Sequence, residues 1–401
     1  MGTPRATRRT AGRWLTRSVF GFGLASFLSD AGHEAATSVL PALVALLGSA
    51  PAALGVIEGV SDGMASAAKL LGGWWADRPH LRKPLAVGGY FVTGLSVGAF
   101  ALASSWLHIA AARSIGWFAR GVRGPVRDAM LADAVPAEAV GRAFGFHRAM
   151  DTAGAVAGPL LALALVAVVP VRQVFLWAVI PGVLASAAFA VLVRPSAPRV
   201  TAPRPFGVSL RMLPAAYRRF LAAVFLFGAG DFARTLLILR ATQLLAPVAG
   251  LSAATATALA LYAGHNVLYA AASYPVGRLA DRVSPRALLV MGYLLGTATA
   301  VLAAVATPSL GVLMALFGCA GLTVAFEDTL EGTIVAREVP AEVRGTAYGA
   351  LAATNGVGDL VSSSLVGVLW AAAGAGVAFG AATALCLAGT IVLATARRSG
   401  G

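Results

Sequence analysis

The fold is decided by a segment that occurs twice in the chain, as Gly73-Trp74-Trp75-Ala76-Asp77-Arg78 and as Gly277-Arg278-Leu279-Ala280-Asp281-Arg282. The two copies lie 204 residues apart. The same offset relates Pro136-Ala137-Glu138 to Pro340-Ala341-Glu342, and Asp62 to Asn266. One offset at three separated places indicates that the chain consists of two copies of one unit.

The composition predicts a membrane protein. Hydrophobic residues make up 58% of the 401 residues and charged residues only 12%, whereas a soluble protein carries about 25% charge. Stretches of roughly 20 apolar residues recur along the chain, and each is long enough to cross a bilayer as a helix. The sequence therefore predicts an all-α integral membrane protein of twelve transmembrane helices in two pseudo-symmetric six-helix bundles, with spans at 18–46, 52–76, 85–105, 107–125, 143–168, 174–193, 218–246, 252–276, 287–306, 309–334, 346–371 and 375–395.

The positions of the basic residues predict the orientation. The formal net charge is +14, but the basic residues concentrate at the termini and in every second connection between spans, while the other connections contain only Arg172. This is the positive-inside distribution, so we expect both termini in the cytoplasm of a bacterial inner-membrane protein and no nucleic-acid partner. We expect an N-terminal bundle at 1–193, a cytoplasmic linker at 194–217 that is rich in Pro and Arg, and a C-terminal bundle at 218–401.

Charged residues also predict which helices lie inside the bundle. The spans at 85–105, 174–193, 287–306 and 375–395 contain no Asp, Glu, Lys, Arg or His. A charge in hydrocarbon costs about 2.5–3.5 kcal/mol or more. The four uncharged spans should therefore face lipid, and the others should line the interior.

The intramembrane charges follow helical stripes. Asp30, His33 and Glu34 share one face of the first span. Glu327 and Glu331 lie one turn apart, so one carboxyl of each such pair should be protonated or paired with another helix. Opposite charges at Arg148 and Asp151, or at Asp231 and Arg234, are equally consistent with structural ion pairs.

The repeated segment resembles the loop between helices 2 and 3 of the major facilitator superfamily, which has the form Gly-x-x-x-Asp-Arg-x-Gly-Arg-Arg. The first copy matches at Gly73, Asp77, Arg78, Arg82 and Lys83, but Pro79 and His80 occupy the region of the second glycine. The second copy matches at Gly277, Asp281, Arg282 and Arg286. The resemblance implies a conformational latch between the two bundles, formed by Gly73, Asp77, Arg78, Arg82, Gly277, Asp281 and Arg282. The alternative is that the charges only determine topology.

Two further motifs are similar to motifs of that superfamily. Gly154, Gly158 and Pro159 resemble a motif associated with antiporters, although a packing face of small residues is an equal alternative. Arg113 with Gly116 resembles a motif implicated in proton coupling. An intramembrane arginine needs a carboxylate partner, and Asp30 and Glu34 are the candidates. The dense charged stretch around these motifs resembles uncharacterised bacterial permeases.

The resemblance implies a proton-coupled efflux antiporter for a small organic solute that works by alternating access. We expect Asp30 and Glu34 to carry protons together with Arg113, with Glu327 and Glu331 as second choices. Arg113, Phe227, Asp231, Arg234 and His265 are the expected substrate contacts, although His265 is equally consistent with helix packing. The mixed charges leave the substrate open between a cation and an anion or zwitterion.

Two other functions remain as alternatives. One is a proton-coupled importer with the same fold, and the other is a membrane-embedded enzyme. His33 with Asp30 and His147 with Asp151 lie beside no Ser or Cys nucleophile, and no Gly-x-x-x-x-Gly-Lys-Ser/Thr loop is present. We therefore expect no catalytic residues, no metal and no cofactor, and a monomer whose partners are the solute, protons and the bilayer.

Overall fold

The computed structural model describes residues 14–48, 51–195 and 204–395. The N-terminal arginines and part of the predicted linker lie outside the described residues. Within them the structure contains helices and no strands, which confirms the all-α prediction. The long helices of the first half are α1 (Arg17–Leu46), α2 (Pro51–Ala76), α3 (Pro79–Ala99), α4 (Trp106–Asp133), α5 (Val140–Val166) and α6 (Val171–Leu192).

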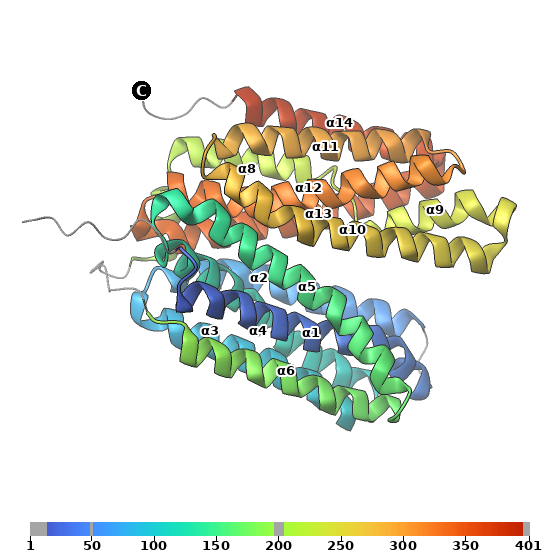
Figure 1. Cartoon of the computed structure of the whole chain (residues 1–401), viewed down its shortest axis with the longest axis horizontal. Coiled ribbons are helices and arrows are strands. Elements are labelled where there is room, and N and C mark those ends of the chain that lie inside the picture. The colour runs from blue at the N-terminus through green and yellow to red at the C-terminus, as the bar shows by residue number, and fades with distance from the viewer. Residues whose placement is uncertain (1–13, 49–50, 196–203, 396–401) are drawn as a thin grey trace, which may run out of the picture.

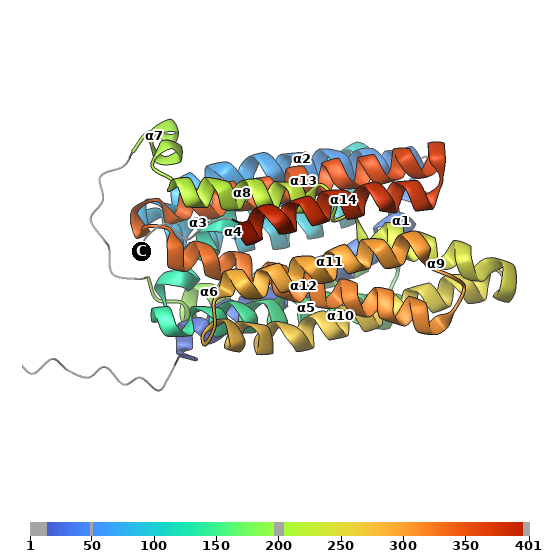
Figure 2. The ribbon, with the colours of Figure 1, turned by 90° about the horizontal axis from the view of Figure 1, so that it is seen from above.

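The second half repeats this arrangement. After the short helix α7 (Phe206–Arg211), its helices are α8 (Ala215–Gly228), α9 (Arg234–Ala249), α10 (Leu251–Ala280), α11 (Pro285–Val305), α12 (Leu310–Glu338), α13 (Arg344–Ala373) and α14 (Ala375–Thr395). Short 3-10 turns at 100–102, 137–139 and 341–343 complete the chain. The two halves lie side by side as two helical bundles (Figures 1 and 2). We call α1–α6 the N half and α8–α14 the C half.

The helix boundaries differ from the predicted spans at the repeated segment. The turn between α2 and α3 is limited to Asp77 and Arg78, and Pro79 begins α3. Proline suits the first helical position because its fixed φ matches the helix and its missing N–H is not needed there. Arg82 therefore lies on the first turn of a helix rather than in a loop.

The predicted span at 218–246 is not one helix. It is broken between α8 and α9, and Asp231 lies in the break. A Cβ atom at Gly230 would lie 2.5 Å from the Ala382 carbonyl oxygen of α14, so the chain approaches α14 more closely than any other residue would allow. The Ser362 hydroxyl donates to the Asp231 carbonyl at 3.0 Å and Arg234 Nη1 donates to the Phe232 carbonyl at 2.8 Å. These bonds satisfy the carbonyl groups that the break releases.

Seven helical segments are long and apolar enough to cross a membrane by length and composition alone, within the described part of the chain. They are built on α3, α5, α6, α11, α12, α13 and α14. The remaining long helices α1, α2, α4 and α10 are more polar, and the α8–α9 unit is broken. These helices depend on neighbouring helices to cover their polar faces.

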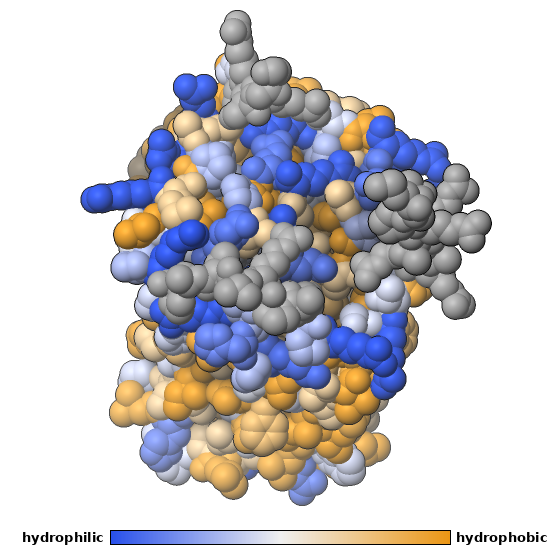
Figure 3. All heavy atoms as spheres, turned by 90° about the vertical axis from the view of Figure 1, so that its left-hand side faces the viewer, coloured by the Kyte–Doolittle hydropathy of each residue, from blue (hydrophilic) through white to orange (hydrophobic). Residues whose placement is uncertain are grey.

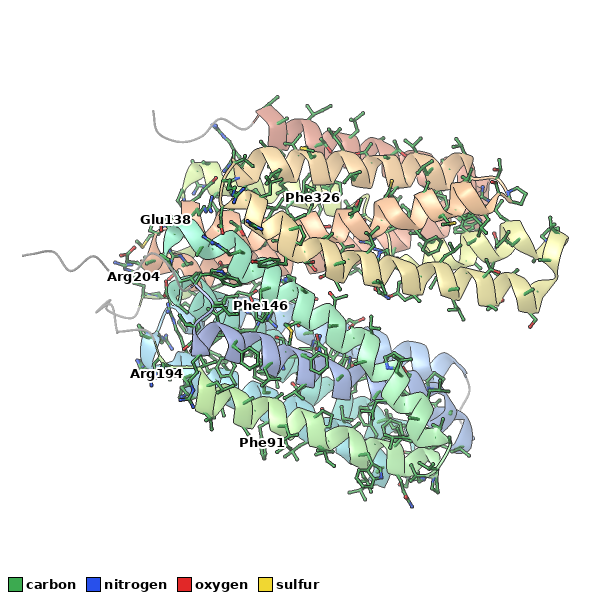
Figure 4. All side chains as sticks on the ribbon, in the orientation of Figure 1. Phe91, Glu138, Phe146, Arg194, Arg204 and Phe326 are labelled. Carbon is green, nitrogen blue, oxygen red and sulfur yellow. The ribbon has the colours of Figure 1, made fainter. Side chains whose placement is uncertain are left out.

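The peripheral position of four helices is confirmed. The main contacts of α3 and α6 are with helices of the N half, and those of α11 and α14 are with helices of the C half. The two halves meet instead through α5 with α10 and through α2 with α13, with further contacts of α12 and α4. Phe91 of α3, which is 44% exposed, points away from the bundles, whereas Phe146 of α5 points toward the place where the halves meet (Figure 4).

The halves are joined at one end, which we call the closed end. One hydrophobic cluster includes residues of both halves, and Phe144 stacks on Tyr348 across the junction with ring centroids 6.0 Å apart. The other two clusters belong to one half each and lie toward the opposite, far end. The closed end also carries α7 and the C-terminal end of α14 (Figures 1 and 2), and Figure 3 shows hydrophilic side chains gathered on it.

Candidate functional site

Asp77 joins the two halves at the closed end. Its carboxylate accepts hydrogen bonds from the backbone N–H of Gly345 at 2.7 Å and of Thr346 at 3.1 Å, and from the Thr346 hydroxyl. These donors form the N-terminus of α13, where the helix dipole favours a negative charge. Gly73 permits the approach, because a Cβ atom there would lie 2.6 Å from the Gly345 carbonyl oxygen. Asp77 thus caps a helix of the opposite half.

Asp281 makes the equivalent contact in the other direction. Its carboxylate accepts from the backbone N–H of Gly141 at 2.8 Å and from Arg142 Nε at 2.8 Å, at the N-terminus of α5. Arg337 Nη2 donates to it as well, at 2.9 Å. Gly277 lies against the Gly141 backbone, where a Cβ atom would be 2.2 Å from the carbonyl oxygen. The pseudo-symmetric pair of carboxylates therefore holds both bundles together.

A third contact at the closed end joins the predicted latch residue Arg82 to two residues that were not predicted, Asp133 and Arg344. Asp133 accepts from Arg82 Nη1 at 2.7 Å within the N half and from Arg344 Nη1 at 2.5 Å across the junction. In the C half, Arg286 forms a bidentate pair with Glu338 at 2.7 and 2.5 Å. The sequence signal for the Asp133–Arg344 pair was the basic residue Arg344, which lies in the connection between the predicted spans 309–334 and 346–371. Its partner Asp133 lies more than 200 positions away.

Two predicted latch residues lie outside these contacts. The guanidinium of Arg78 stacks on the Trp74 ring of its own half at 4.2 Å, and Trp74 Nε1 donates to the Arg204 carbonyl at 2.8 Å. Arg282 is exposed. Neither makes a hydrogen bond or ion pair between the halves within the described residues, whereas Arg142 and Arg344 do.

The electrostatics of Asp77 are set by its position between the halves. Burial raises the pKa of the Asp77 carboxyl to about 6, although the hydrogen bonds from Thr346 and Gly345 and the nearby Arg82 oppose the rise. A carboxyl with this pKa changes its charge close to physiological pH. The contact at the α13 N-terminus is therefore sensitive to pH.

The centre of the N half is a network of ion pairs. Asp30 of α1 pairs with Arg120 of α4, with Oδ1 and Nη1 2.9 Å apart. Arg127 donates to Asp128 at 3.0 Å and lies 3.8 Å from Asp151 of α5. Each carboxylate in this group has an arginine beside it. The predicted proton carrier Asp30 is thus an ion-pair partner in this conformation.

Several predicted site residues surround the ring of Trp117 of α4. Trp117 itself was not predicted from the sequence. The His33 ring lies 4.3 Å from its centroid, and the Arg113 guanidinium lies 4.5 Å from it. Its indole N–H donates to Asp62 at 2.8 Å. Glu34, whose side chain is 34% exposed, lies 3.8 Å from His33. Arginine over an indole face is a favourable contact, so Trp117 orders this wall of the N half.

The C half holds carboxyls in a different way. Glu331 of α12 is only 2% exposed. The Tyr293 hydroxyl donates to one of its oxygens at 2.8 Å and Asn355 Nδ2 donates to the other at 2.8 Å. Both donors are neutral, and no ion pair of Glu331 or of Glu327 is found within the described residues. Tyr269 of α10 donates to the neighbouring Asp328.

Four predicted substrate contacts of the C half have the following surroundings. The side chain of Phe227 is fully buried and stacks on Tyr293 at 3.7 Å with nearly parallel rings. Close packing against α11 and α14 holds this ring in the core in the conformation described here. Asp231 and Arg234 form a bidentate pair at 2.9 Å. His265 is buried beside Tyr262, and its Nε2 has no hydrogen-bond partner.

The small residues of α5 act in packing. A Cβ atom at Gly154 would lie 2.3 Å from the Phe27 carbonyl oxygen of α1, and one at Gly158 would lie 2.6 Å from Cβ of Glu34. Pro159 follows inside the same helix. The glycines of this motif therefore bring α5 against α1 and fix the level of Glu34 relative to α5.

The described part of the chain contains no group of three or more His, Cys, Asp or Glu side chains that could hold a metal ion. Many of the charged and polar side chains described above lie on α1, α4, α5, α10, α12 and α13, and of these helices α4, α5, α10, α12 and α13 contact the opposite half.

Comparison with known proteins gives consistent results. The model of the Major Facilitator Superfamily matches residues 22–267 and 250–400. An uncharacterised MFS-type transporter of Methanocaldococcus jannaschii is 28% identical over 365 residues, which cover 89% of each chain. The fucose:proton symporter FucP of E. coli has the same fold, with a TM-score of 0.78 and 15% identity over 95% of this chain and 98% of that chain. A bacterial homologue of the iron transporter ferroportin, in an outward-facing state, gives a TM-score of 0.75 and 15% identity over 94% and 98%.

Proposed function

Because the chain belongs to the major facilitator superfamily, we propose that this multi-pass membrane transporter moves a small organic solute by proton-coupled alternating access. The proposed location is the bacterial inner membrane with both termini in the cytoplasm, which the positive-inside distribution supports. The closed end then faces the cytoplasm, and the conformation described here is outward-facing. The two halves would rock about a site at the middle of the membrane.

The observation that carries the proposal is the environment of Glu331. A carboxylate in a low-dielectric interior needs a positive partner or a proton. Glu331 receives only neutral donors, Tyr293 and Asn355, and Glu327 lies one turn away. We therefore place Glu331 first among the proposed proton carriers and Glu327 second. Asp30 follows because Arg120 already compensates its charge, and Glu34 and Arg113 are proposed to couple the N half to the same cycle.

The closed-end contacts supply the proposed latch. Asp77 and Asp281 each bind a helix N-terminus of the opposite half, and Asp133 bridges to Arg344. All three contacts must break before the closed end opens. Release of the latch is therefore proposed to accompany the change from the outward-facing to the inward-facing state, with Arg82, Gly73 and Gly277 positioning the carboxylates.

The proposed direction is efflux by antiport. Its support is the resemblance of Gly154, Gly158 and Pro159 to the antiporter motif. Gly158 packs against Cβ of Glu34, so this motif lies against the part of α1 that carries an acidic residue. Import by symport would give the opposite sign of proton movement, so one measurement separates the two.

The test is proton flux in proteoliposomes that contain the purified protein and a pH-sensitive dye. With an acidic interior, addition of a transported solute outside should release internal protons if the protein is an antiporter. Glu331→Gln should abolish this response, whereas Glu342→Gln, the same change at an exposed residue of the closed end, should not. A normal response of Glu331→Gln would contradict the proposed carrier, and solute uptake accompanied by proton uptake would replace antiport with symport.

A further inference from the structure

Equivalent helices of the two halves carry opposite charge. Between positions 113 and 128, α4 bears four arginines and one aspartate. The equivalent stretch of α12, at the offset of 204, bears Glu327, Asp328 and Glu331 and no basic residue. Arg123 and Arg127 thus correspond to Glu327 and Glu331. The N half therefore carries arginines on a helix whose equivalent in the C half carries carboxyls.

The basic side chains of the N half and the acidic side chains of the C half meet near Arg148 of α5. Its guanidinium lies 4.0 Å from Asp128 and 3.8 Å from Asp151, which are long distances for ion pairs. Its Nε is buried and has no hydrogen-bond partner. Helix α5, which carries Arg148, packs against α10 and α12 of the opposite half, and Asp328 lies on α12. Arg148 is therefore incompletely satisfied within its own half, on a helix that lies against the other half.

The opposite side of this junction is built by α10 and α12. Tyr269 of α10 donates its hydroxyl to Asp328 and holds that carboxyl in place. The side chains of Arg148 and Asp128 remain 19% and 15% exposed although they lie within helices of the membrane region. The groups are thus preorganised on both sides of the junction and partly accessible from between the halves.

From this arrangement we infer that the solute is a zwitterion, whose anionic group binds Arg148 in the N half and whose cationic group binds Asp328 and Glu327 in the C half. This inference rests on the proposed transport function and names its substrate class. A zwitterion satisfies both sets of charges without adding net charge to a site of low dielectric. A solute with a single charge satisfies one set and leaves the other uncompensated.

Binding across the junction also couples the solute to the motion of the halves. The two ends of a zwitterion draw Arg148 and Asp328 toward each other, and these residues belong to different bundles. A ligand that favours one arrangement of the halves shifts their equilibrium by its difference in affinity for the two states. The inference therefore explains how a small solute is coupled to the rocking motion.

The test uses the purified full-length chain in detergent and measures thermal unfolding in the presence of a solute library sorted into zwitterions, monoanions, monocations and neutral compounds. We expect the stabilising solutes to be zwitterions. Arg148→Gln and Asp328→Asn should each raise the apparent Kd of such a solute roughly 10- to 100-fold, the effect of losing a hydrogen bond to a charged group. Arg211→Gln, a change at an exposed residue of the short helix α7, should leave the Kd unchanged.

Several results would overturn the inference. One is stabilisation only by solutes with one charge or none, and another is a library in which no zwitterion stabilises the wild-type chain. A third is an unchanged Kd in both variants, which would make Arg148 and Asp328 a brace between the halves rather than a binding pair. The charge preference of the wild type decides the matter even if Arg148→Gln fails to fold. Counterflow in proteoliposomes tests the proposed transport function separately. A zwitterion that stabilises the protein but shows no counterflow is bound and not transported.

Discussion

The N half and the C half use the same helical scaffold to treat buried charge in opposite ways. Arg127 and Asp151 face each other in the N half as an ion pair. At the offset of 204 residues the C half has Glu331 and Asn355, and a hydrogen bond joins them. Because an ion-paired carboxylate already has its counter-charge, it gains little from a proton. A carboxyl with neutral donors can change its protonation without leaving an arginine uncompensated, so we propose a structural role for the ion pairs of the N half and proton exchange for the C half.

Substitutions at the equivalent positions 151 and 355 should produce the largest effect. Asp151→Asn leaves Arg127 and Arg148 with one carboxylate fewer, and removing one partner from a buried ion pair costs about 3–5 kcal/mol. Asn355→Asp makes the C half resemble the N half without removing a charge partner, so its cost should be smaller. Thermal unfolding in detergent measures both. Equal losses would show that the two halves treat charge alike.

The two latch carboxylates should also differ. Asp281 accepts from the side chains of Arg142 and Arg337, whereas the donors to Asp77 are backbone groups and a threonine hydroxyl. A hydrogen bond to a charged group contributes roughly 1.5–3 kcal/mol. Asp281→Asn should therefore destabilise the closed end by about this amount, and Asp77→Asn by less. Spin labels at the far-end positions Ser104 and Thr307 would report the distance between the halves; a larger change for Asp77→Asn would reverse the assignment.

Helix packing can be compared at a pair of equivalent glycines. A Cβ atom at Gly154 would lie 2.3 Å from the Phe27 carbonyl oxygen, whereas one at the equivalent Gly358 would lie 3.0 Å from the Gly228 backbone. Overpacking of this kind typically costs about 1–3 kcal/mol. Gly154→Ala should approach the upper value and Gly358→Ala the lower one in thermal unfolding. The opposite order would contradict the close packing of α1 on α5.

The smallest expected effect is a pH dependence of the closed end. The pKa of Asp77 is raised to about 6 where the carboxyl is enclosed between the halves, and it falls toward about 3.9 when the end opens and water surrounds the group. The enclosed state therefore binds the proton more tightly. Protonation of Asp77 therefore favours the closed end as the pH falls through about 6. This contribution to the stability of the closed end is lost as the pH rises above about 6.

The same far-end spin labels test this pH dependence. Between pH 7 and pH 5 the wild type should shift toward the state with a closed latch, and Asp77→Asn should remove that part of the shift. A pH response of equal size in Asp77→Asn would assign it to another group. Asp281→Asn serves as the matched variant of the other half and should retain the response.

The sequence was sufficient for the fold because the offset of 204 residues and the alternating basic connections constrain the whole chain. It also located Asp77 and Asp281 correctly at the ends of α2 and α10. It could not identify Trp117, whose role depends on side chains from α1 and α2 that meet it only in the folded bundle. It gave no signal for the stacking of Phe227 on Tyr293, because the position of Phe227 on a predicted inner helix carries no information about a ring on α11.

The break between α8 and α9 had a weak local signal. Gly228, Gly230 and Asp231 are poor helix formers, but the hydrophobic run continues through them, and tertiary contacts with α13 and α14 decide the outcome. The pairing of Asp133 with Arg344 had no local signal, since the partners belong to different halves. Charge partners at long range are the part of the site that only the structure supplies.

The most direct test of the central claim is infrared difference spectroscopy of the protein in lipid, recorded while the external pH is stepped across the neutral range. The account predicts a carboxylic C=O band from a protonated buried carboxyl that is lost on deprotonation, is absent in Glu331→Gln and persists in Asp30→Asn. A band that persists in Glu331→Gln and disappears in Asp30→Asn would place proton exchange in the N half and contradict the account.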